Sequence, residues 1–210
     1  MATEGRFDRQ ILRVSREEFS KHGYYGTRID TVALNAKVNK RMIYEFCHTK
    51  EGLYMITLSD VSREAMDVFK QSLPQLRTAE DVRTLYSILF NLLEDQSEFI
   101  RLWAWERMDP TIHGPRILET ASSIFEQVRQ IVSARFLKSS PESCGALFEA
   151  VEALCHGYLL TSAMYFRCDP ETDTAEISGT QSPALRRLNM SMNTQGILLE
   201  SIERLLVRSV

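Results

Sequence analysis

A chain of 210 residues, of which 44% are hydrophobic, is long and apolar enough to bury a substantial core, so a disordered protein is excluded. The net charge of −3 argues weakly against a chain that binds nucleic acid over its whole surface, but the charge is uneven. Residues 1–50 hold ten Lys or Arg against six Asp or Glu, whereas residues 51–210 carry a net charge of −7. A basic surface confined to one domain is expected when only that domain meets phosphate.

The sequence also predicts the compartment of the protein. Its N-terminal segment is charged throughout and no run of about 18 apolar residues occurs, so we expect neither a secretion signal nor a membrane span. The cysteines lack the dense spacing of a secreted disulfide scaffold and are expected to be reduced thiols: Cys47, Cys144, Cys155 and Cys168. Both observations predict a cytoplasmic protein.

A first helix is predicted by apolar residues at helical spacing, and Gly23 is expected to end it. Its inner face carries Phe7, Ile11, Val14 and Phe19. On or near its outer side are Arg6, Arg9, Arg13 and Arg16. We interpret these arginines mainly as a solvated face; the alternative is that Arg6 or Arg9 reaches a phosphate or the minor groove.

The stretch from Thr27 to Lys50 predicts two short helices joined by a tight turn. One face of the first helix carries Ile29, Val32, Ala33 and Ala36, and the second helix has an apolar edge at Ile43 and Phe46, with Val38 between them. Thr27 with Asp30 is a candidate capping box, and Asn39 is a candidate N-cap. So short a connection makes the helices cross steeply, which is the helix-turn-helix geometry that presents its second helix to the major groove of DNA.

The outer side of this second helix supplies the predicted DNA contacts. Lys40 and Arg41 are the leading base readers, because Lys or Arg against guanine is the commonest specific contact; phosphate contact alone is the alternative. Tyr44 and Lys50 are assigned to phosphate, although Tyr44 is alternatively half-buried against the first helix. The remaining candidates are Thr27, Arg28, Asn39, Met42 and His48.

These residues carry a resemblance to a known family. Over about residues 6–55 the chain resembles the DNA-binding domain of the tetracycline-repressor (TetR) family of transcriptional regulators. The matching positions are Gly23-Tyr24, Thr27, Ile29, Val32-Ala33, Val38, Ile43-Tyr44, Phe46 and Lys50-Glu51. Lys37 stands where the family usually has Gly, at a cost of about 1 kcal/mol if its backbone is left-handed. Arg41 and Met42 replace a small Gly-Thr pair and Cys47 replaces an aromatic residue, so the operator preference of relatives does not transfer.

Further helices are predicted after residue 50, which makes the fold all-α. Thr49 is expected to cap a long helix that ends near Gln71, before Leu73-Pro74, and that acts as a lever between two domains. These domains are a helix-turn-helix DNA-binding domain at 1–50 and a helical effector-binding and dimerisation domain at 51–210. The other predicted helices span 81–95, 98–108, 116–137, 142–167 and 193–207. Residues 168–189 are expected to form a long loop, with a short helix near Pro183 to Met190.

The helices at 142–167 and 193–207 are apolar over more than one side, which predicts a subunit interface. Two helices from each chain would then form a four-helix bundle in a homodimer, as the resemblance also implies.

A ligand pocket in the second domain is implied mainly by the resemblance and is supported by a supply of aromatic residues. The candidate lining residues are Tyr86, Phe90, Phe99, Trp103, Glu106, His113, Phe125, Tyr158 and Met164. An ordinary core or surface role is the simpler interpretation of each. The spacing of Cys144, Cys155 and His156 lacks the paired pattern of a metal site, so neither a metal nor another cofactor is expected.

The combined prediction is a homodimeric, ligand-responsive transcriptional regulator, with repression favoured over activation. It would bind a palindromic DNA operator and be released by a small-molecule effector of unknown identity. A ligand-independent DNA architectural protein is the nearer alternative. An all-helical enzyme or carrier is disfavoured, because the sequence has no nucleophile elbow, phosphate loop or metal cluster.

Overall fold

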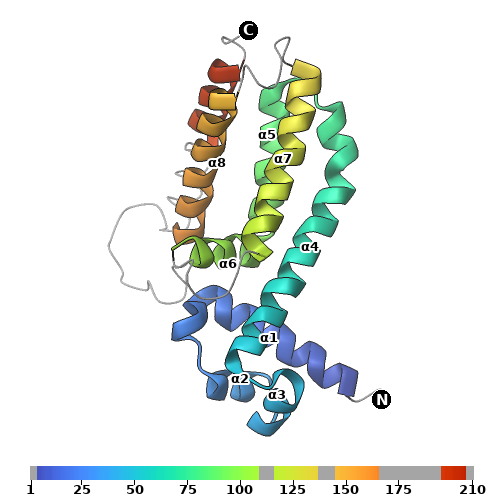
Figure 1. Ribbon diagram of the computed structural model, residues 1–210, viewed down its shortest axis with the longest axis vertical. Coiled ribbons are helices and arrows are strands. Elements are labelled where there is room, and N and C mark those ends of the chain that lie inside the picture. The colour runs from blue at the N-terminus through green and yellow to red at the C-terminus, as the bar shows by residue number, and fades with distance from the viewer. Residues whose placement is uncertain (1–3, 109–115, 137–144, 166–194, 207–210) are drawn as a thin grey trace, which may run out of the picture. The chain divides into compact units, whose positions relative to one another are not determined.

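A computed structural model describes residues 4–108, 116–136, 145–165 and 195–206, and all regular structure in these ranges is helical. The all-α prediction is therefore confirmed (Figure 1). The predicted loop at 168–189, with its short helix at 183–190, lies outside the described residues. No helix within the described ranges is both long and apolar enough to span a lipid bilayer.

The backbone forms two compact units. The N-terminal unit comprises Met1–Val68 and Glu98–Ser122, and the C-terminal unit comprises Phe69–Ser97 and Ser123–Val210. The N-terminal unit contains α1 (Glu4–Gly26), α2 (Ile29–Asn35), α3 (Lys40–Cys47), the first part of α4 (Lys50–Thr78), nearly all of α6 (Ser97–Met108) and the start of α7 (Arg116–Phe136). Its core is apolar and includes Ile11, Phe19, Val32, Ile43 and Leu53.

The first long helical segment of α1 ends at Gly23, as the sequence pattern predicted. Gly23 has non-helical backbone angles, φ 67° and ψ −177°, and a short second segment follows this kink as far as Gly26. The kink turns the chain toward α2, and Thr27 stabilises the connection between the two helices. The single proton of the buried Thr27 hydroxyl is shared between two acceptors, the carbonyls of Gly23 (2.8 Å) and Glu18 (3.1 Å).

The predicted capping box of Thr27 and Asp30 is therefore wrong. The N-cap of α2 is Arg28, whose side chain makes no capping hydrogen bond. Thr27 cannot cap α2 because its hydroxyl is committed to the backbone of α1. The sequence pattern fits either arrangement, and only the packing of α1 against α2 decides between them.

The other two predicted caps are confirmed. The Asn39 side chain accepts a hydrogen bond from the Arg41 amide at 2.9 Å, which starts α3. The Thr49 hydroxyl accepts from the Gly52 amide at 2.9 Å at the start of α4. Between α2 and α3, Lys37 has φ 52°, so it does occupy the left-handed region and carries a strain of about 1 kcal/mol.

The prediction that Leu73-Pro74 ends α4 is wrong, since α4 continues through Pro74 to Thr78. A proline inside a helix removes one backbone donor, that to the carbonyl four residues earlier. Pro74 lies on the exposed side of α4, where water can satisfy that carbonyl, and the fully buried Leu76 anchors the following turn. Tertiary packing here outweighs the local preference to stop.

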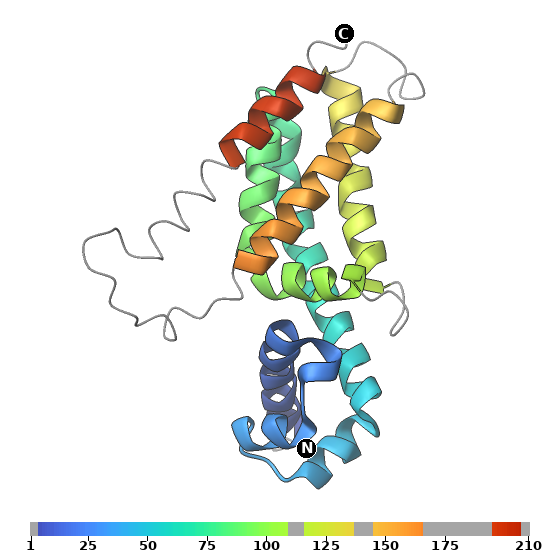
Figure 2. The ribbon, with the colours of Figure 1, turned by 90° about the vertical axis from the view of Figure 1, so that its left-hand side faces the viewer.

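The C-terminal unit is a set of helices that run alongside one another (Figure 2). It contains α5 (Val82–Asp95), α8 (Gly145–Tyr165), a helix at 195–206, and the remaining parts of α4 and α7. The Asp81 side chain caps α5 by accepting from the Thr84 amide at 2.7 Å. The contact between Arg83 and Glu203 (3.9 Å) joins α5 to the helix at 195–206. The structure confirms that these helices exist within the described residues, and α5 begins one residue after the predicted start and ends at the predicted residue.

Candidate nucleic-acid interface

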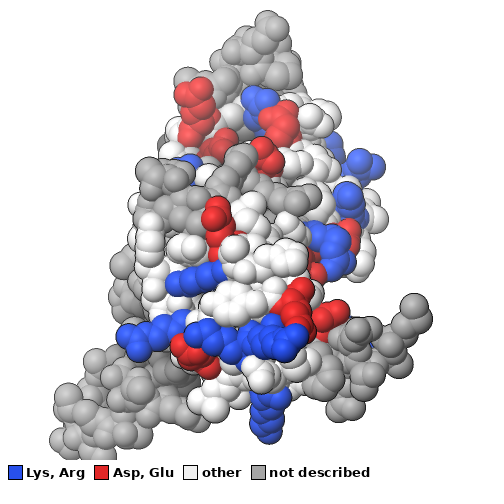
Figure 3. Space-filling view, turned by 60° about the horizontal axis from the view of Figure 1, so that its bottom comes forward, with Lys and Arg blue, Asp and Glu red and all other residues white. Residues whose placement is uncertain are grey.

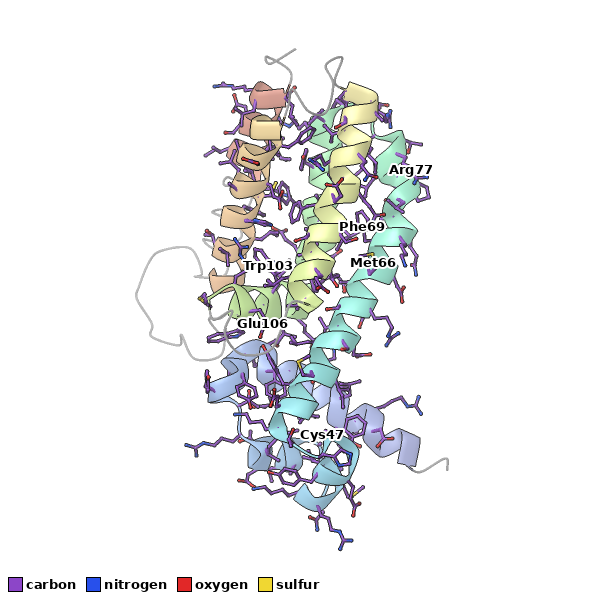
Figure 4. The ribbon with its side chains drawn as sticks, in the orientation of Figure 1. Cys47, Met66, Phe69, Arg77, Trp103 and Glu106 are labelled. Carbon is purple, nitrogen blue, oxygen red and sulfur yellow. The ribbon has the colours of Figure 1, made fainter. Side chains whose placement is uncertain are left out.

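The helix α3 buries one side and exposes the other. Ile43 and Cys47 are buried, and the Cys47 thiol donates to the Ile43 carbonyl at 3.0 Å, where α3 meets α4 (Figure 4). The exposed residues recur at helical spacing, so they form one stripe along α3. This α3 stripe consists of Arg41, Tyr44, Glu45 and His48.

Both predicted base readers are held by carboxylates. The Lys40 ammonium lies 2.7 Å from Asp30 of α2, and this hydrogen bond raises the pKa of Lys40. The Arg41 Nε donates to Glu45 one turn later, at 2.8 Å. Figure 3, which brings the lower end of Figure 1 forward, shows basic and acidic side chains next to one another on this face. Lys40 therefore forms an ion pair with α2, whereas both members of the Arg41–Glu45 ion pair belong to the α3 stripe.

The remaining predicted contacts fall into different environments. Arg28 and His48 are exposed, and Met42 is half-buried. Tyr44 is 41% exposed, which leaves much of its ring accessible. Thr27 is only 1% exposed, and Asn39 uses its side chain as a cap. The side chains of Thr27 and Asn39 are thus both bonded to the backbone of their own unit.

Lys50 begins α4 and lies against an aromatic cluster. Its ammonium is 4.6 Å from the centre of the Tyr24 ring, a cation–π distance. The Tyr24 ring lies 5.3 Å from that of Tyr54. Partial burial lowers the pKa of Lys50. The ring fixes the lysine at the N-terminus of a capped helix, where the amides and the positive charge together suit an anion.

The sequence did not predict that α6 packs within the N-terminal unit. The Tyr54 hydroxyl of α4 donates to the Glu106 carboxylate of α6 at 2.8 Å, and both side chains are buried. Glu106 is labelled on α6 in Figure 4. The Trp105 indole donates to the Ser20 carbonyl of α1 at 3.2 Å. Glu106, a predicted ligand anchor, is thus a buried partner of Tyr54.

Arg16 links α1 to α4 and α6. The prediction that it belongs to a solvated face is therefore wrong. Its guanidinium lies 2.6 Å from Glu98, 2.5 Å from Glu64 and 3.2 Å from Asp60. Its side chain is only 20% exposed. Burial alone would lower the pKa of Arg16, but its bonds and charge interactions with Glu64 and Glu98 raise it. The periodicity of α1 could not reveal these partners, which lie far away in the sequence.

The predicted ligand residues are divided between the two units. Phe99, Trp103 and Glu106 are buried in the N-terminal unit. In the C-terminal unit the Phe90 ring lies 5.0 Å from the ring of Tyr158 and 6.2 Å from that of Tyr86. The Phe125 ring also lies in this unit, 5.0 Å from the ring of His156. His113 and the side chain of Met164 fall outside the described residues.

The thiols and carboxylates do not form a metal centre in the part of the chain that the structure describes. No group of three or more His, Cys, Asp or Glu is placed to hold a metal ion there. Cys47 and Cys155 are buried free thiols, and burial raises the pKa of both. Neither environment favours a reactive thiolate.

Comparisons with known proteins identify the helix-turn-helix. Residues 11–55 match the model of the bacterial regulatory proteins of the tetR family. The chain is 26% identical over 164 residues to the HTH-type transcriptional repressor NicS of Pseudomonas putida, an alignment that covers 74% of this chain and 72% of that one. It is 29% identical over 100 residues to the HTH-type transcriptional repressor SCO4008 of Streptomyces coelicolor, covering 48% of this chain and 49% of that one.

Solved structures share the fold over nearly the whole chain. The HlyIIR mutant protein superposes with a TM-score of 0.58 at 18% identity, covering 97% of this chain and 98% of that one. A structure assigned to the TetR family from Mesorhizobium loti gives 0.52 at 18% identity, covering 94% and 97%. Residues 11–55 are therefore a helix-turn-helix domain of the tetR type, and the chain as a whole is similar to named transcriptional repressors in sequence and to solved TetR-type structures in fold.

Proposed function

We propose that this regulator acts as a homodimer that binds a palindromic operator and releases it when a small-molecule effector binds. The observation that carries the proposal is the α3 stripe, which presents a cation, an aromatic hydroxyl, a carboxylate and a histidine on one accessible face. A helix that buries one side and exposes such groups on the other fits the major groove. A two-fold dimer would place two such helices on half-sites one or more helical turns apart.

Individual roles follow from the environments of the residues. Arg41 is the leading base reader, and Lys40 reads a base or a phosphate from its position beside Asp30. Tyr44 and Lys50 contact phosphate, with Arg28, Met42 and His48 at the margins. Thr27 and Asn39 support the site by fixing the corner before α2 and the start of α3.

The dimer interface is proposed on α8 and the helix at 195–206. One side of α8 exposes residues that are mostly small and recur at helical spacing, namely Ala150, Ala153, Leu154, Gly157 and Thr161. Leu154 is 39% exposed, and Ile197 on the other helix is 60% exposed. Small residues allow close approach of two helices, and a second copy of the chain would cover the two exposed apolar side chains.

Effector response is proposed to arise in the helical domain at 51–210 and to reach DNA through α6 and α4. The effector must bind more tightly to a state whose recognition helices are wrongly spaced, because equal affinity for both states shifts nothing. α6 contacts α1 through Trp105 and α4 through Glu106 within one unit. A displacement of α6 would therefore act on the elements that hold α3.

Selection of bound sequences from random duplex DNA tests the function. We expect the full-length chain to enrich an inverted repeat, and we expect members of a small-molecule library to abolish that enrichment. Binding with little sequence preference, unaffected by any compound, would instead support the architectural alternative.

The Lys50→Ala variant is expected to bind every DNA sequence more weakly, with its base preference unchanged. Lys50 is proposed to neutralise one phosphate, so the slope of log affinity against log salt should decrease in magnitude by about one. Fluorescence anisotropy titrations at several salt concentrations measure this slope. Lys70→Ala is the control, because Lys70 is an exposed lysine of α4 in the C-terminal unit. Equal salt-dependence slopes for Lys50→Ala and Lys70→Ala would show that Lys50 does not contact phosphate.

The Leu154→Glu variant is expected to raise the dimer dissociation constant at least about tenfold, because a charge would be buried in an apolar contact. The monomer should remain folded, since Leu154 is already partly exposed. Sedimentation velocity over a dilution series measures the dissociation constant. Leu34→Glu, at a 76% exposed leucine of α2, makes the same change in the other unit and should leave the dimer intact. An unchanged dissociation constant for Leu154→Glu would exclude this interface.

A further inference from the structure

The α3 stripe contains a carboxylate where the proposed function requires attraction to a polyanion. Glu45 is 61% exposed and lies one helical turn after Arg41, which is 84% exposed. A carboxylate facing DNA is repelled by phosphate, so its presence weakens non-specific binding. Glu45 could instead contribute to sequence recognition by accepting a hydrogen bond from a base.

The contact between the two side chains leaves suitable groups for such readout. Arg41 uses its Nε–H to reach Oε1 of Glu45 at 2.8 Å. The guanidinium has four further N–H donors on its terminal nitrogens, which match the O6 and N7 acceptors of guanine. Glu45 has a second oxygen, Oε2, and an acceptor in the major groove suits the N4 amino group of cytosine.

We propose that Arg41 and Glu45 form one reading pair, in which Arg41 selects a guanine and Glu45 selects a cytosine at a separate position of the half-site. Glu45 is thus a specificity-determining residue and also orients Arg41. Lys40 is less suited to this role because its ammonium is held by Asp30 of α2. The inference rests on the proposed operator binding and adds the base that Glu45 recognises.

Sequence selection on variants of the full-length chain tests the pair. Glu45→Ala should lose at least about fivefold preference for cytosine at one position, the lower end of what a good side-chain-to-base contact contributes. Glu45→Gln should shift that position toward adenine, because a glutamine amide matches the N6 and N7 groups of adenine. Arg41→Ala should lose preference for guanine at a different position. The control is Glu17→Ala, which removes an exposed carboxylate of α1 and should leave the enriched sequence unchanged.

The outcomes separate this inference from the proposed function. An enriched inverted repeat for the parent chain that stays unchanged in Glu45→Ala would overturn the reading pair alone. The pair is likewise wrong if Glu45→Ala alters only the guanine position, or only raises affinity uniformly, since orientation of Arg41 or phosphate repulsion would then account for Glu45. Absence of any enriched sequence for the parent chain would overturn operator binding and the pair together.

Discussion

The Gly23→Ala substitution is expected to lower the free energy of unfolding by about 2–3 kcal/mol relative to the parent chain. Gly23 has φ 67° and ψ −177°, a backbone region that is essentially restricted to glycine. A Cβ atom at this position would also lie 2.9 Å from Cδ2 of the Trp105 ring. Because Trp105 is itself bonded to the Ser20 carbonyl, the ring cannot move away without losing that contact. Urea denaturation followed by circular dichroism measures the difference.

Two further variants separate the backbone cost from the steric cost. Gly26→Ala is the control, because Gly26 has no positive φ and its Cβ would meet only the exposed His22 side chain, at 3.2 Å. In a Trp105→Ala background, Gly23→Ala should retain the backbone cost but lose the collision. If Gly23→Ala cost no more than Gly26→Ala, the proposed constraint at the kink would be wrong.

The Tyr54→Phe variant is expected to lose about 1.5–3 kcal/mol of stability at neutral pH, because the Glu106 carboxylate would lose a donor in a buried site. Burial and the hydrogen bond with Glu106 raise the pKa of Tyr54 well above its ordinary value of 10. The folded state therefore holds this proton more tightly than the unfolded state does. That contribution is fully present below about pH 10 and is lost as the pH rises further.

The difference in stability between the parent chain and Tyr54→Phe should consequently shrink above about pH 10. Urea denaturation at pH 8 and at pH 10.5 gives the comparison. Tyr25→Phe is the control, since Tyr25 is 71% exposed and its substitution should have little effect at either pH. A constant difference between the parent chain and Tyr54→Phe across this range would contradict the buried pair.

Local signals predicted the helix-turn-helix well. Asn39 and Thr49 cap helices through bonds to amides only two or three residues away, so nearby sequence determines them. The exposure of Arg41, Tyr44 and His48 follows from a period of 3.6 residues once Ile43 is placed inside. Such features need no knowledge of distant packing.

The errors arose where distant residues decide the outcome. Arg16 appeared to be a solvated arginine, but its partner Glu98 lies 82 positions away. Thr27 fitted a capping box, but its hydroxyl donates to backbone carbonyls of α1 instead. Pro74 suggested a helix end, but the burial of Leu76 extends α4 past it. Composition and periodicity hold no signal for such pairings.

The inclusion of α6 in the N-terminal unit matters for exchanging DNA specificity between regulators. A chimera joined near residue 50 would combine one protein's α1 and Tyr24 with another's residues at 105 and 106. The kink at Gly23 would then face a foreign side chain at position 105, and Arg16 would meet foreign residues at positions 60, 64 and 98 unless both parents match there. Under the proposed operator binding, we therefore expect specificity to transfer by exchange of the exposed side chains of α3 within an intact host and not by exchange of residues 1–50 as a block.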